Sequence, residues 1–255
     1  QGGTGPETIT LDDSVGSLAD QYSLSVNTVQ AFTLGSPSGL VNYTAEVLEL
    51  STSGVASTIR VESTAAATDY TLRAGDGDDT ISFGGTARDV SSIYGEVTVF
   101  GGAGDDRVNY NDDNSATNNT YTVSPDNLSR TGAAVVDPNG IEAVVVNAGS
   151  GTDLFNVPAT LAATPVTING NGGNDTFRVA NGAWDSAIVG PVTVNGGNGF
   201  DELDINDTSD TGADNYAVTA TQASKSAVGA ATIDYATIEQ LELDANHAAN
   251  VINVN

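Results

Sequence analysis

The stretch that decides the fold is Val97–Tyr110, with the sequence VTVFGGAGDDRVNY. Its apolar residues alternate with polar ones, at Val97 and Val99 before the glycines and at Val108 and Tyr110 after them. Alternation with a period of two is typical of short strands that bury one face. The glycine-rich segment between the two predicted strands permits a tight turn. Its two aspartates make that turn rich in oxygen ligands.

This unit recurs along the chain. Fourteen-residue copies begin at Leu48, Tyr70, Val97, Val144, Val166, Val192 and Leu241. In every copy the first, third, twelfth and fourteenth positions are aliphatic or aromatic, although only 39% of the chain is hydrophobic. A repeat this short cannot bury its inner face alone and has to stack on its neighbours. The sequence therefore predicts that these positions point inward and form columns of like residues.

A longer period is superimposed on the unit, because the copies at Leu48 and Tyr70 recur 96 residues later at Val144 and Val166. We therefore expect one elongated all-β domain over residues 1–255, a parallel β-helix or solenoid with about 24 residues per rung. Its super-repeats of about 96 residues would cover roughly residues 1–100, 101–195 and, in part, 196–255. Right-handed crossovers are the expectation for parallel strands. The only segment expected to allow a short turn of helix is Ser14–Tyr22.

Composition narrows the possible partners. The chain has 33 acidic and 7 basic residues, a formal net charge of −26. Nucleic acid needs clustered lysine and arginine and is excluded as a partner, whereas cations are favoured. The absence of cysteine excludes disulfides and thiolate metal sites. No apolar run approaches about 18 residues, so we expect no membrane-spanning segment.

The turns carry a second pattern, the nonapeptide Gly-Gly-x-Gly-x-Asp-x-apolar-x. Gly101–Asn109 and Gly196–Asp204 fit it in full, Ala74–Ser82 and Ala148–Asn156 lack the first glycine, Gly170–Arg178 lacks the second, and Gly2–Thr10 has Glu7 in place of the aspartate. In these segments the chain resembles the RTX, or haemolysin-type, calcium-binding repeat proteins. It is more similar still to large repetitive bacterial surface proteins that carry such nonapeptides singly within longer β-helical rungs.

The resemblance implies calcium ions between stacked turns. Carried over to this chain, the carboxylate ligands would be Asp79, Asp106, Asp153, Asp175 and Asp201. The carbonyl ligands would come from Gly75, Gly77, Gly102, Gly104, Gly149, Gly151, Gly173 and Gly199 and their neighbours. Calcium accepts six to eight oxygen ligands in flexible geometry, and adjacent strands lie about 4.8 Å apart, so two stacked turns can share one ion.

A simpler interpretation is that the motif is only a tight turn in which aspartate or asparagine caps backbone amides. Charge argues for calcium, since stacked carboxylates repel each other strongly without a counter-ion. A second acidic series follows the second strand of several units, at Asp12, Asp13, Asp112, Asp113, Asp207 and Asp210. We expect this series to be a solvated loop rather than a further set of ligands.

These observations predict a structural role and no enzyme activity. The protein would be a calcium-stabilised rod, stalk or filament-forming segment of a bacterial extracellular, adhesin-like cell-surface protein. Because the sequence opens within a unit, we expect self-association or continuation into a longer repetitive chain. The alternative is a polysaccharide-binding or polysaccharide-lyase-like β-helix module, for which Arg73 and Arg107 would flank the ions. Trp184 would be a packing residue or, less favourably, a sugar contact.

Overall fold

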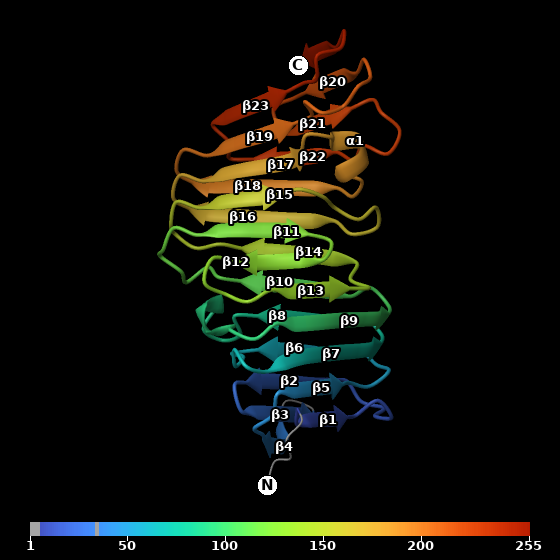
Figure 1. Cartoon of the computed structure of the whole chain (residues 1–255), viewed down its shortest axis with the longest axis vertical. Coiled ribbons are helices and arrows are strands. Elements are labelled where there is room, and N and C mark those ends of the chain that lie inside the picture. Colours follow the sequence, from blue (N-terminus) through green and yellow to red (C-terminus); the bar gives the residue numbers. More distant parts are fainter. Residues whose placement is uncertain (1–5, 34–35) are drawn as a thin grey trace. The chain divides into compact units, whose positions relative to one another are not determined.

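The computed structural model describes residues 6–33 and 36–255, and its strands form two large, mostly parallel sheets (Figure 1). The predicted all-β, parallel character is therefore confirmed. The glycines of the opening motif Gly2–Thr10 lie outside the described residues. The chain divides into two compact units, unit 1 (Gln1–Asp112 and Asp126–Ala143) and unit 2 (Asp113–Pro125 and Val144–Asn255), which we describe separately.

Unit 1 contributes strands to both sheets. Its strands are β1 (Thr8–Asp12), β2 (Asp20–Ser25), β3 (Thr28–Thr33), β4 (Ser36–Asn42), β5 (Val47–Ser51), β6 (Thr58–Val61), β7 (Asp69–Asp76), β8 (Thr80–Phe83), β9 (Val97–Ala103), β10 (Arg107–Asn111), β12 (Asn127–Arg130) and β13 (Val136–Asn139). The order is β1-β5-β7-β9-β13-β12 in one sheet and β10-β8-β6-β2-β3-β4 in the other. The β2–β3, β3–β4 and β12–β13 pairs are antiparallel.

Unit 2 repeats the arrangement. Its strands are β11 (Thr120–Ser124), β14 (Ala143–Asn147), β15 (Leu154–Val157), β16 (Val166–Gly172), β17 (Thr176–Asn181), β18 (Val192–Asn198), β19 (Glu202–Asn206), β20 (Asn215–Val218), β21 (Gln222–Lys225), β22 (Ile233–Ala236), β23 (Gln240–Asp244) and β24 (Val251–Val254). One sheet has the order β11-β15-β17-β19-β23 and the other β24-β20-β21-β22-β18-β16-β14. Here the antiparallel pairs are β20–β21 and β21–β22.

Copies of the fourteen-residue unit pair in register within two runs, the copies at Leu48, Tyr70 and Val97 and those at Val144, Val166 and Val192, whereas the first strand of the seventh copy, β23, pairs with the second strand of the sixth, β19. Val146 pairs with Ile168 and Ile168 with Val194, as predicted for one column of the core. Phe155 and Phe177 pair in the same way in the second strands. In the first six copies every one of the four repeated apolar positions is at most 6% exposed. The predicted inward face is thus confirmed for these copies.

The seventh copy departs from the prediction. In β24, Ile252 and Val254 are 50% and 77% exposed, and Leu241 and Leu243 in β23 are only half-buried. β24 pairs on one side with β20, and β23 with β19, and in the described residues no further strand lies on their other sides. The apolar pattern is present in this copy, but its residues are exposed or half-buried in the structure.

Very little of the described chain is helical, and the helical segments lie outside the segment that the sequence analysis expected. Ser14–Tyr22 forms no helix, because strand β2 already begins at Asp20. Within the described ranges, two short helical segments occur, a 3₁₀ turn at Val90–Ser92 and α1 at Trp184–Ala187. Among the described residues, no helix has the length and apolar character needed to cross a membrane.

Candidate metal centre

The predicted aspartates of unit 1 form a hydrogen-bonded ladder. The main-chain N–H of Ser57 donates to Oδ1 of Asp79 at 2.5 Å, and the N–H of Asp79 donates to Oδ1 of Asp106 at 2.8 Å. The N–H of Asp106 donates in turn to Oε2 of Glu142 at 2.8 Å. Each carboxylate therefore caps the turn of the preceding copy. We call this chain of contacts the aspartate ladder.

Unit 2 contains an aspartate ladder of the same construction. The N–H of Asn119 donates to Oδ1 of Asp153 at 2.7 Å, and that of Asp153 to Oδ1 of Asp175 at 2.8 Å. The ladder continues from Asp175 to Oδ1 of Asp201 at 2.8 Å and from Asp201 to Oε2 of Glu239 at 2.7 Å. All five aspartates predicted as ligands lie in these two ladders, and the capping role of the simpler interpretation is present in both.

Two members of the ladders were missed by the sequence analysis. Glu142 and Glu239 each supply the last carboxylate, and neither belongs to a nonapeptide. Each stands two residues before the first apolar position of a unit, at Val144 and Leu241. That shared position in two consecutive super-repeats was the available signal.

Capping uses only one oxygen of each carboxylate. The Oδ2 atoms of Asp79, Asp106, Asp175 and Asp201 are buried and accept no hydrogen bond. These four residues are at most 1% exposed. A buried carboxylate oxygen without a donor is costly, because its charge is desolvated and uncompensated. The second oxygens are therefore the part of the ladder that needs a further partner.

Main-chain carbonyls converge with these oxygens over the first glycine of the motif. A methyl group added at Gly170 would lie 2.4 Å from Oδ2 of Asp175 and 2.6 Å from the carbonyl oxygen of Gly196. The same pair of groups meets over Gly101, from Asp106 and Gly140, and over Gly196, from Asp201 and Thr237. Glycine at this position thus lets a carboxylate oxygen and a carbonyl oxygen approach the backbone closely, in a space where any side chain would collide with them.

The residues around this space fit calcium in kind, since carboxylate and carbonyl oxygens are the ligands that calcium accepts. The carbonyls are partly different from those predicted. A Cβ atom added at Gly102, Gly104, Gly173 or Gly199 would collide with the predicted carbonyl of Gly75, Gly77, Gly151 or Gly173, respectively. The carbonyl of Gly149 accepts the N–H of Gly172 at 3.1 Å. These glycines serve the close approach of successive turns.

Electrostatics show that the ladder carboxylates lack a compensating positive charge. Burial, together with neighbouring carboxylates, raises the pKa of Asp79 and of Asp175 to about 7. Burial also raises the pKa of Asp106 and of Asp201. Within residues 6–33 and 36–255, these four carboxylates form no ion pair with lysine, arginine or histidine. A proton or a metal ion can supply the missing positive charge.

We expect the calcium-free protein to lose stability as the pH rises from about 5 to about 8. The folded pKa of Asp79 and Asp175 is about 7 and lies above 3.8, the ordinary pKa of an aspartate carboxyl. The folded state therefore holds protons that the unfolded state has released, and this contribution disappears as the pH passes 7. Melting curves in chelator at the two pH values measure the effect. An equal or higher melting temperature at pH 8 would show that the ladder carboxylates are not destabilised by ionisation.

A second acidic cluster lies in unit 2 but already contains a cation. Asp185, Asp207 and Asp210 bring carboxylate oxygens within 4.8 Å of one another, as a metal site requires. The ammonium group of Lys225 lies among them, 2.7 Å from Asp207, 2.8 Å from Asp210, 3.2 Å from Asp214 and 3.6 Å from Asp185. This lysine cluster is therefore an internal ion-pair network rather than the metal centre.

Unit 1 has a smaller counterpart, in which Nε of Arg130 lies 3.0 Å from Asp112 and Nη2 lies 3.2 Å from Asp89. The expectation of a solvated loop is wrong for Asp112 and Asp207, which are both fully buried. The sequence analysis missed both basic partners. Arg130 and Lys225 are 95 residues apart, the spacing of the super-repeat, and this was the signal available.

The residues that suggested carbohydrate chemistry are engaged elsewhere. The guanidinium of Arg73 lies over the ring of Phe100, 4.5 Å from its centroid, and Nε of Arg107 donates to Oδ1 of Asn109. Trp184 is fully buried, and its indole N–H donates to the carbonyl of Ala231 at 2.9 Å. Trp184 is thus a packing residue and does not present a ring to a sugar.

Comparison of the chain with protein-family models, with curated proteins and with solved structures found no match. The candidate centre therefore rests on the geometry of the two ladders.

Proposed function

We propose that this chain is a structural, calcium-stabilised segment of an extracellular cell-surface protein, with adhesion, display or filament building as its use. The observation that carries the proposal is the stacking of buried Oδ2 atoms beside main-chain carbonyls in both ladders. A repeated ligand set of this kind stabilises a fold along its whole length. It offers no single reactive centre of the kind that an enzyme uses.

We further propose that the two sheets belong to a closed, right-handed β-helix of about 24 residues per rung. Support comes from the in-register parallel pairing of the first strands with first strands and of second strands with second strands. Additional support comes from the ladders, because each turn caps the turn of the preceding copy. Such a stack suits a rod or stalk that continues into further repeats or associates with itself.

In this proposal Asp106, Asp175 and Asp201 hold calcium through Oδ2, together with the neighbouring carbonyl oxygens. The ion supplies positive charge to carboxylates that are otherwise uncompensated. Because it binds only the folded state, it stabilises that state by mass action. Extracellular modules bind calcium at about 10⁻⁴–10⁻³ M, so the protein would be rigid outside the cell and looser before export.

Polysaccharide binding is a second candidate, favoured by one polar pocket of about 390 Å³ in unit 2. Asn156, Arg178 and Asp204 line it from three neighbouring strands. Amide, guanidinium and carboxylate groups are suited to sugar hydroxyls. No aromatic side chain lines this pocket. A titration with acidic and neutral oligosaccharides, compared with the Arg178→Ala variant, distinguishes this candidate from the structural one.

The calcium proposal is tested by melting the protein in chelator and in millimolar calcium. We expect a higher melting temperature in calcium, and a loss of part of this difference in Asp106→Asn, which alters one of the three proposed carboxylate ligands. This substitution keeps the capping oxygen and removes the charge. Asp105→Asn is the matched control, because Asp105 is an exposed carboxylate in the same turn and should leave the calcium response intact. Equal melting of the unaltered protein in both solutions would refute the proposal.

A further inference from the structure

The lysine cluster of unit 2 has a defined local framework. In the antiparallel pair β20–β21, Tyr216 lies directly opposite Lys225. The hydroxyl of Tyr216 donates to Oδ2 of Asp207 at 2.7 Å, and Asp214 stands two residues before the tyrosine. Both carboxylates then contact the lysine ammonium. The tyrosine, the two aspartates and the lysine form one buried group.

Unit 1 builds the same framework near β2 and β3. The hydroxyl of Tyr22 donates to Oδ2 of Asp13 at 2.5 Å, and Asp20 stands two residues before the tyrosine. The residue directly opposite Tyr22 is Ala31. The carboxylates and the tyrosine of the lysine cluster are thus repeated, while the basic side chain is replaced by a methyl group.

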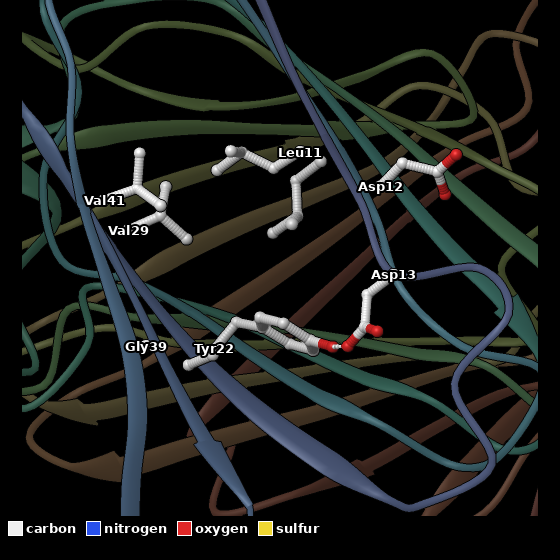
Figure 2. Close-up of a pocket in the computed structure, with 9 residues that line it drawn as sticks. Leu11, Asp12, Asp13, Tyr22, Val29, Gly39 and Val41 are labelled. Carbon is white, nitrogen blue, oxygen red and sulfur yellow. Dashed lines mark hydrogen bonds between the residues drawn. The ribbon is translucent and has the colours of Figure 1, made fainter.

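The absence of that side chain coincides with a pocket of about 250 Å³ (Figure 2). Its lining includes Ala31, Tyr22 and Asp13, and apolar walls from Leu11, Val29 and Val41. In Figure 2 the Asp13 carboxylate points at the Tyr22 hydroxyl, whereas Asp12 points away from the pocket. A lysine at the position of Ala31 would fill this pocket, with its alkyl stem along the apolar wall and its ammonium group beside the carboxylate.

Asp20 provides a second, independent indication of a missing cation. It is 9% exposed, and its Oδ1 atom accepts no hydrogen bond. Burial, followed by the nearby carboxylates of Asp13 and Asp20, raises the pKa of the Tyr22 hydroxyl. In unit 2 the corresponding Asp214 lies 3.2 Å from the lysine ammonium.

We propose that this pocket binds a small primary alkylammonium, whose ammonium group pairs with Asp13 and Asp20 and whose alkyl chain lies along Leu11, Val29 and Val41. An ammonium has three donors and no acceptor, which matches carboxylates that need donors. The four-carbon stem of lysine sets the expected length of the chain. A bare metal ion would leave the apolar wall unused.

The proposal is tested by calorimetric titration of the 255-residue chain with methyl-, ethyl-, propyl- and butylammonium chloride, at constant ionic strength and in chelator. We expect affinity to rise by about fourfold for each added methylene that reaches the apolar wall. Asp13→Asn and Asp20→Asn should each weaken butylammonium binding by about tenfold or more, because each removes a charged hydrogen-bond acceptor.

Two further variants keep the test decisive. Ala31→Lys should place an ammonium in the pocket, raise the melting temperature and abolish butylammonium binding. Lys225→Ala should create a second site in unit 2, seen as added butylammonium binding. The proposal fails if the unaltered chain shows no binding of butylammonium. It also fails if Ala31→Lys binds as much as the unaltered chain, or if affinity does not depend on chain length. Chelator is present throughout, so the calcium proposal does not affect the result.

Discussion

Replacing Phe177 with alanine should lower the free energy of unfolding by about 3–5 kcal/mol, the usual cost of truncating a buried aromatic side chain. Phe177 is fully buried in β17, and its ring stacks on that of Phe155 with centroids 4.7 Å apart and planes at 6°. Phe155 stacks in turn on Tyr121 at 4.8 Å. Removing the ring leaves a cavity in the core. Because strand pairing fixes the neighbouring backbone, the surrounding residues cannot move in to fill the cavity, and little of the lost stability is regained.

Urea or guanidinium unfolding of the variant measures this change. Phe200→Ala is the matched control, because Phe200 is 54% exposed in the following turn and should change stability by about 0.5 kcal/mol or less. A loss below about 1 kcal/mol for Phe177→Ala would contradict the burial of the second-strand columns.

Replacing Lys225 with alanine should cost about 3–5 kcal/mol, because removing one partner of a buried ion pair leaves uncompensated charge. Asp207 is fully buried and would lose its cation, and the Tyr216 hydroxyl would remain its donor. The side-chain hydrogen bonds of Lys225 also hold the pKa of Asp210 below its usual value. The loss of stability would therefore come from several carboxylates at once, because all of them share the ammonium group of Lys225.

Denaturant unfolding again provides the measurement, with Arg178→Ala as the control. The Arg178 side chain is 58% exposed, and its Nε lies 3.9 Å from Asp204. An exposed pair of this kind contributes about 0–1 kcal/mol. Similar losses for the two variants would show that the lysine cluster is solvated and not a buried network.

The repeated apolar positions could be predicted from the sequence because a strand with one buried face leaves a period-two pattern at every copy. Val146, Ile168 and Val194 illustrate this, since all three are aliphatic, equally placed in their units and fully buried in one column. The pattern did not reveal that the seventh copy is uncovered. Exposure at Ile252 depends on which strand lies beside β24, and local composition carries no information on that.

The candidate site was predicted in its carboxylates and only partly in its carbonyls. The aspartate of the nonapeptide is one residue type at one position, so Asp106 and Asp175 could be found by matching the motif. The carbonyls of Gly140 and Thr237 come from other segments, 39 and 41 residues away in sequence from Gly101 and Gly196, over which they lie. Only the stacking of turns brings them to the site, and side-chain identity does not encode a main-chain carbonyl.

The buried basic residues were missed for a related reason. Arg130 and Lys225 sit in stretches where the fourteen-residue pattern is interrupted, and charged residues are rarely buried unless paired. Their pairing with Asp112 and Asp207 depends on how separate segments of the chain come together in the fold. Their acidic surroundings in the sequence led to the prediction that Asp112 and Asp207 are solvated. The 95-residue spacing of Arg130 and Lys225 was the sequence signal for their basic partners.

The measurement that tests the calcium account most directly is a calorimetric titration of calcium into the metal-free protein and into a triple variant, Asp106→Asn, Asp175→Asn and Asp201→Asn. The variant keeps the capping oxygens, and circular dichroism verifies that it is folded. The account predicts saturable binding to the unaltered protein at about 10⁻⁴–10⁻³ M, with that binding lost in the variant. Binding that is absent from the unaltered protein, or equal in both proteins, would contradict it and leave the ladders as caps of the turns alone.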